Sequence, residues 1–94
     1  MKSHLYKFTI DYLKDSKGND MKVEPLVFET KSHEDIFKIV EKMKDKMQLD
    51  ETDSTALAVG LKLFGGVMLK NNDKEPFKQL LPYFKDFMKE LKKK

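Results

Sequence analysis

Two histidines, His4 and His33, are the side chains of this sequence best suited to acid–base or metal chemistry near neutral pH. His33 is followed directly by Glu34 and Asp35, and a histidine beside a carboxylate can act as a base or ligate a metal ion. Neither histidine stands in a recognisable ligand spacing. We therefore predict a structural or surface role for both, and we keep as an alternative a small-ligand-binding or enzymatic pocket near His4, Tyr6 and His33.

Three glycines, Gly60, Gly65 and Gly66, lie within one apolar stretch. No Gly-Lys-Ser or Gly-Lys-Thr follows them and the spacing of a dinucleotide fingerprint is absent, so they do not form a phosphate loop. Because each glycine inside a helix costs about 1 kcal/mol relative to alanine, three in one helix need a reason. Close helix packing is the prediction. The alternative is a helix loosened at Gly65 and Gly66 beside a pocket, which makes all three glycines candidates for a ligand or interaction site.

Two groups of acidic residues resemble calcium ligands only in composition. Residues 50–53 lack the alternating order of an EF-hand loop and suit the first turn of a helix. Asp15 and Asp20 flank Gly18, and Asp and Gly are the residues that a tight turn requires. We predict helix capping and turn formation for these acids. We expect no catalytic residue, no metal and no cofactor.

The composition describes a small domain with one modest core. The chain has 94 residues, no cysteine, 37% charged residues and a net charge of +3. Its length excludes a multidomain enzyme, and the lack of cysteine excludes disulfides and thiolate zinc sites, so we expect a cytoplasmic protein. No stretch reaches the roughly 20 apolar residues of a membrane span.

The basic character of the chain comes from its last ten residues. They hold five lysines and two acids, a surplus of three that equals the whole net charge. Arginine, which makes bidentate contacts with phosphate and guanine, is absent from the sequence. We expect residues 92–94 to form a loose lysine tail, and nucleic-acid binding through it is an alternative that we do not favour.

The first third of the chain predicts a β-hairpin over residues 4–30. Apolar and polar residues alternate over 4–14, residues 15–20 are turn formers, and a second β-like run covers 21–30. Pro25 has no N–H to donate, so it should lie at an edge or a bulge of the second strand. The hairpin should pack on the helices that follow.

The rest of the chain predicts three or four helices, at residues 33–47, 51–70 and 74–92. Ser32 and Asp35 resemble a capping box before the first helix. The second is apolar on nearly every face except at Lys62, which indicates that other elements or a second copy surround it. In the third helix, capped by Asp73, Pro82 should cause a kink or a break. We expect one α+β domain of ββααα order.

Several segments resemble one family over nearly the whole chain. They are His4-x-Tyr6, the run from His33 to Glu41, the run from Ala56 to Gly65, the run from Val67 to Asn71, Pro76-Phe77, and Phe87-Met88-x-x-Leu91-Lys92. The family is the domain of unknown function number 3861. The resemblance implies a small bacterial, cytoplasmic, single-domain protein. It implies no activity, cofactor or catalytic residue.

The function that we expect is that of a non-enzymatic binding or interaction module. A two-stranded sheet is marginally stable alone, and pairing its free edge with a second copy would stabilise it. The expected partner is therefore a second copy or another protein. A ligand-binding or enzymatic domain with its pocket near His4 and His33 is the first alternative, and weak nucleic-acid binding is the second.

Overall fold

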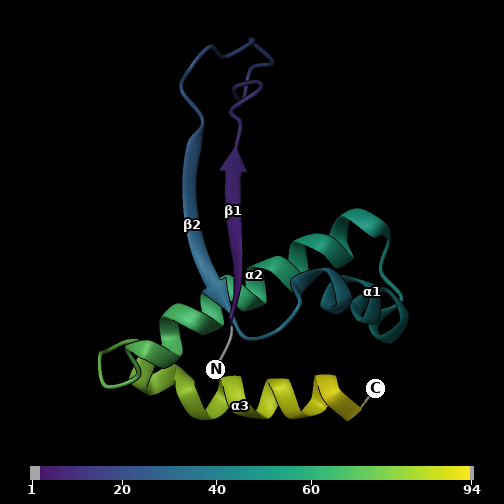
Figure 1. Cartoon of the computed structure of the whole chain (residues 1–94), viewed down its shortest axis with the longest axis vertical. Helices are drawn as coiled ribbons and strands as arrows, with labels where there is room; N and C mark the ends of the chain where they lie inside the picture. The colour runs from purple at the N-terminus through teal and green to yellow at the C-terminus, as the bar shows by residue number, and fades with distance from the viewer. Residues whose placement is uncertain (1–2, 94) are drawn as a thin grey trace. The chain divides into compact units, whose positions relative to one another are not determined.

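A computed structural model describes residues 3–93 as an antiparallel hairpin followed by three helices (Figure 1). The strands are β1 (His4–Ile10) and β2 (Leu26–Ser32), and the helices are α1 (Ile36–Met47), α2 (Glu51–Lys70) and α3 (Phe77–Lys93). This order confirms the predicted α+β fold class. The chain divides into two compact units, residues 1–33 and 34–94, and each is described by itself.

The hairpin pairs its strands in a regular antiparallel register. His4 lies opposite Ser32, Phe8 opposite Phe28, and Ile10 opposite Leu26. Beyond Ile10 the regular ladder ends, and pairing resumes only at an isolated bridge between Lys14 and Asp20. The chain takes four residue steps from Ile10 to Lys14 but six from Asp20 to Leu26, so the returning segment carries two extra residues there. Both predicted strands are therefore shorter at the turn end than expected.

Pro25 lies in this irregular segment, directly before β2. A proline cannot supply a ladder hydrogen bond, so a place outside the regular ladder agrees with the reason for predicting an edge or a bulge there. At the end of the hairpin the Asp15 carboxylate accepts from the backbone N–H groups of Lys17 and Asn19, both at 2.9 Å. Gly18 has a φ of +86°, a conformation that suits glycine. The prediction that Asp15 serves the turn is confirmed.

The first helix begins later than predicted. Ser32 belongs to β2, and Asp35 is the N-cap of α1, with its carboxylate accepting from the backbone N–H groups of Phe37 and Lys38. The prediction of a capping box formed by Ser32 and Asp35 is therefore wrong, because Ser32 is still part of the strand ladder. In contrast, Asp50 caps α2 as predicted and accepts from Asp53 N–H at 2.8 Å.

The core of the helical unit forms where all three helices meet. Met43 of α1, Ala58 of α2 and Leu91 of α3 are buried together, and six half-buried apolar side chains pack against them. Those six are Ile39, Val40, Met47, Leu57, Leu61 and Met88. The helix α2 contacts both α1 and α3. This agrees with the predicted central place of the second helix among the helices.

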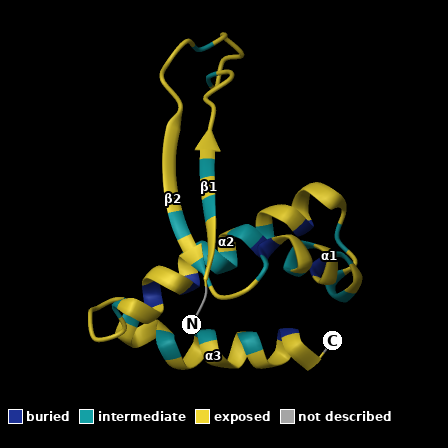
Figure 2. Ribbon diagram, in the orientation of Figure 1, coloured by how far each residue is buried: buried dark blue, intermediate teal, exposed yellow. Residues whose placement is uncertain are grey.

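The other elements of the chain do not surround α2, and its coverage by a second copy, the other form of this expectation, stays a prediction. Its buried residues are Ser54, Ala58, Gly65 and Met68, while Phe64, Val67 and Leu69 remain exposed by 43–53%. Much of the ribbon of α2 is accordingly coloured as exposed in Figure 2. The chain thus leaves apolar helix surface uncovered.

The third helix is one continuous helix, with Pro82 inside it. It begins at Phe77, so Asp73 does not cap it and Pro76 precedes it. The Phe64 ring contacts both the Phe77 ring and the Phe84 ring, at centroid distances of 6.2 and 6.0 Å. The helix continues through Lys93, so the predicted loose tail is wrong at Lys92 and Lys93, while Lys94 lies outside the described residues.

Candidate functional site

The two faces of the hairpin differ in chemistry. Residues that lie opposite each other share a face, and the face alternates along each strand. One face carries a row of rings, in which the Phe8 and Phe28 rings stack at 5.1 Å and the Tyr6 ring lies 6.5 Å from Phe8. The other face places Lys7 directly opposite Glu29. The hairpin therefore has an aromatic face and a second face, which we call the charged face because it carries Lys7, Glu29 and Lys31 beside Leu5, Thr9 and Val27.

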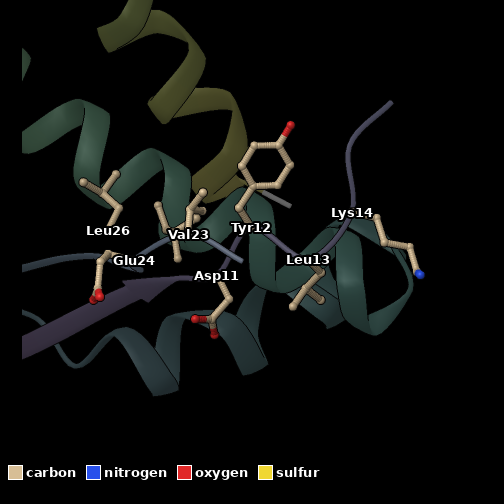
Figure 3. A pocket seen from close by; sticks show the side chains of 8 residues that line it. Asp11, Tyr12, Leu13, Lys14, Val23, Glu24 and Leu26 are labelled. Carbon is tan, nitrogen blue, oxygen red and sulfur yellow. The ribbon is translucent and has the colours of Figure 1, made fainter. Parts of the chain in front are cut away.

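The aromatic face continues past the regular strands into an open hollow of about 770 Å³ (Figure 3). Five apolar side chains line it, and three acidic or basic ones complete its wall. The apolar ones, which we call the apolar hairpin surface, are Ile10, Tyr12, Leu13, Val23 and Leu26. In Figure 3 the carboxylates of Asp11 and Glu24 point to the opposite side of the view from the Tyr12 ring.

The apolar hairpin surface is unusually exposed. Leu13 is exposed by 72%, Leu26 by 63%, and the other three by 49–54%. Single exposed apolar residues are ordinary on protein surfaces, whereas several that adjoin one another mark contact sites. These five residues are not among the candidates predicted from the sequence. The signal that could have found them is their position, because apolar residues stand on both sides of the polar turn at residues 15–20.

The two histidines lie at the other end of the hairpin. The Ser3 Oγ lies 3.4 Å from His33 Nδ1, and the His4 ring lies 6.1 Å from the Tyr6 ring. Because His4 lies opposite Ser32 and His33 follows Ser32 directly, the structure brings the two histidines to the same end of one unit. Neither lines the hollow at the turn end.

The candidate glycines of α2 have different surroundings. A Cβ on Gly65 would lie 3.2 Å from the tip of the Phe84 ring, while a Cβ on Gly60 or Gly66 would have no neighbour within 4 Å. Gly65 therefore has the packing role that the sequence predicts for the glycines. Gly60 and Gly66 are exposed and pack against nothing near enough to require a missing side chain.

Replacing Gly66 with alanine is expected to raise the free energy of unfolding by about 1 kcal/mol, because helix propensity improves and no clash arises. Gly65→Ala is the matched control, and its gain should be smaller because the Phe84 ring must move. Urea titrations followed by circular dichroism measure both. A larger gain for Gly65→Ala than for Gly66→Ala would contradict this assignment.

The charged residue in the middle of α2 is paired. Lys62 Nζ donates a hydrogen bond to Glu34 Oε1, and the Lys62 side chain is only 25% exposed. This hydrogen bond lowers the pKa of Glu34 below its ordinary value, against an opposing effect of desolvation. The pair explains how one lysine is accommodated in a helix that is otherwise apolar at its centre.

Replacing Glu34 with glutamine is expected to lower the free energy of unfolding at pH 7 by about 0.5 kcal/mol. The loss is small because the Glu34 side chain is largely exposed to solvent. A lowered carboxyl pKa stabilises the fold above the ordinary value of 4.5, and this contribution is lost as the pH falls through the lowered pKa. The difference between the wild type and Glu34→Gln should therefore shrink below pH 4.5 in denaturation curves. A difference of constant size from pH 7 to pH 3 would count against the ion pair.

Two further features bear on the class of protein. Within residues 3–93, no three His, Asp or Glu side chains gather closely enough to hold a metal ion. In the same described part, no helix combines the length and the apolar character that crossing a membrane requires. At the turn end of the hairpin, Asp20 pairs with Lys14 at 2.6 Å.

The order of its strands and helices makes this a small α+β protein of the ββααα type. The chain belongs to the family described as "Domain of Unknown Function with solved-structure structure (DUF3861)", whose family model matches residues 4–93. This confirms the resemblance found in the sequence. The crystal structure of a protein of unknown function from Pectobacterium atrosepticum is similar, with 33% identity and a TM-score of 0.84 over 99% of this chain and 100% of that one. Among curated proteins, none matches the chain.

Proposed function

We propose that the protein is a non-enzymatic interaction module that binds protein partners, a second copy of itself included, through its hairpin. The observation that supports this proposal is the apolar hairpin surface, where five adjoining apolar side chains are each about half exposed or more. Adjoining apolar side chains that are exposed to water lower the solubility of a protein. Contact with a partner removes them from water and is therefore favourable.

The backbone of the hairpin supports the same proposal. Within the described residues the sheet contains two strands, so each strand has one edge without a strand beside it. Unpaired N–H and C=O groups along a strand edge can bind a further strand. The hairpin therefore offers a partner both the side chains of the apolar hairpin surface and the backbone groups of its strand edges.

Site-specific photo-crosslinking in the source organism's cells tests the proposal. A photoreactive amino acid at Leu13 or Val27 on the hairpin is compared with one at Lys89, an exposed residue of α3. We expect crosslinked products from the two hairpin positions and few from Lys89. Mass spectrometry then tells whether the captured chain is a second copy or another protein. Absence of products from both hairpin positions would contradict the proposed function.

A further inference from the structure

We propose that a second copy of this chain binds along the outer edge of β2, antiparallel to it, with Thr30 of the two copies facing each other on a two-fold axis. This inference rests on the proposed function, and it assigns the outer edge of β2, rather than the apolar hairpin surface, to the second copy. In such a closed pair the same residues of both copies form the interface. Residues that lie opposite each other in a sheet point to the same face. Each permitted register of a two-fold pair therefore places one residue opposite the same residue of the second copy, and we call the pair centred on that residue.

Charge distinguishes the registers along β2. Centring the pair on Glu29, where the strands overlap fully, places the two Glu29 carboxylates opposite each other, which is destabilising. Centring it on Thr30 places Glu29 of each copy opposite Lys31 of the other. Both side chains are exposed. This register therefore creates two cross-strand pairs of opposite charge, and it pairs two threonines at the centre.

The edge of β1 offers no comparable match. Full overlap of two β1 strands is centred on Lys7, which would place two lysines opposite each other. A shift by one residue, to Phe8, removes that repulsion but pairs Lys7 with Thr9, so it gains no opposite charge. The β2 edge is thus the self-complementary one.

The charged face of the hairpin extends the complementarity. Glu29 already lies opposite Lys7 within its own hairpin. In the proposed dimer Glu29 would stand between Lys7 of its own chain and Lys31 of the second copy, so the charges alternate in sign across the strands. A lysine on an edge strand also discourages pairing in other registers. The pattern Glu29-Thr30-Lys31 therefore favours a closed dimer over open-ended addition of strands.

Charge exchange tests the inference in purified protein. Sedimentation velocity over a range of concentrations should show a dimer for the wild type. Lys31→Glu should weaken the dimer by about tenfold in Kd, because two attractive pairs become repulsive ones. Glu29→Lys should act in the same direction. Lys17→Glu, which makes the same charge change at the turn end, is the matched control and should leave Kd unchanged.

Mixing the two single variants gives the decisive measurement. In a heterodimer of Glu29→Lys with Lys31→Glu, every lysine at these positions faces a glutamate, so fluorescence energy transfer between differently labelled variants should recover the affinity. Circular dichroism checks that each variant is folded. A wild type that dimerises with the same Kd as Lys31→Glu, or a mixture without recovery, would overturn this register while leaving the proposed function intact. A monomeric wild type with hairpin crosslinks to another protein would overturn the second copy as partner, and absence of crosslinks would overturn the proposed function itself.

Discussion

Replacing Leu91 with alanine is expected to lower the free energy of unfolding of the helical unit by about 2–5 kcal/mol. Leu91 is 6% exposed and lies with Met43 and Ala58 at the point where the three helices meet. Removing its side chain leaves a cavity bounded by helices that cannot all move inward at once. Since small domains have a total stability of about 5–15 kcal/mol, this single change should bring the unit close to unfolding.

Leu80→Ala is the matched control for Leu91→Ala. It removes the same atoms from the same helix, but Leu80 is 38% exposed, so its change should stay below about 1.5 kcal/mol. Thermal and urea denaturation followed by circular dichroism at 222 nm compare the two. Equal losses for both variants would show that the C-terminal part of α3 is not packed in the core as described. That result would also restore the prediction of a loose end after residue 91.

The elements of the fold follow from the sequence because their signals are local. The bounds of α2 are as predicted, since Asp50 supplies a capping carboxylate at one end and Asn71 follows at the other. Capping is decided within three or four residues, so a single sequence contains the information. The alternation that predicts β1 is local in the same way.

The errors arise where one residue had to be assigned to one of two competing structures. Ser32 can cap a helix, but it can also continue a strand, and only the pairing with His4 decides for the strand. That pairing joins residues far apart in the sequence. The early end of the regular ladder at Ile10 depends likewise on the two extra residues in the returning segment.

The candidate site illustrates the same limit more strongly. Histidines and glycines stand out in a sequence because their chemistry is distinctive, so His4, His33 and the three glycines of α2 are the candidates that the sequence offers. The apolar hairpin surface is made of ordinary apolar residues, and Leu13 and Val23 would be assigned to a core by their type alone. Only the exposed fractions, which depend on the whole fold, identify them as uncovered.

Replacing Pro82 with alanine is expected to raise the free energy of unfolding by roughly 2 kcal/mol. Pro82 is exposed and lies inside α3, where it removes the hydrogen bond to the Lys78 carbonyl and crowds that carbonyl. Alanine restores the hydrogen bond and relieves the crowding. The gain is reduced because the unfolded chain becomes more flexible when a proline is lost.

The contacts on both sides of Pro82 decide whether this gain appears in full. Phe77 before it and Phe84 after it both contact the Phe64 ring, so the helix already keeps its phase across the proline. An alanine at this position continues the same helix, so the two ring contacts should survive. Pro25→Ala, outside any helix, is the control and should change stability by less than about 1 kcal/mol. A loss of stability in Pro82→Ala, with the Phe64 contacts broken in its structure, would show instead that the proline sets the direction of α3 and that the core depends on it.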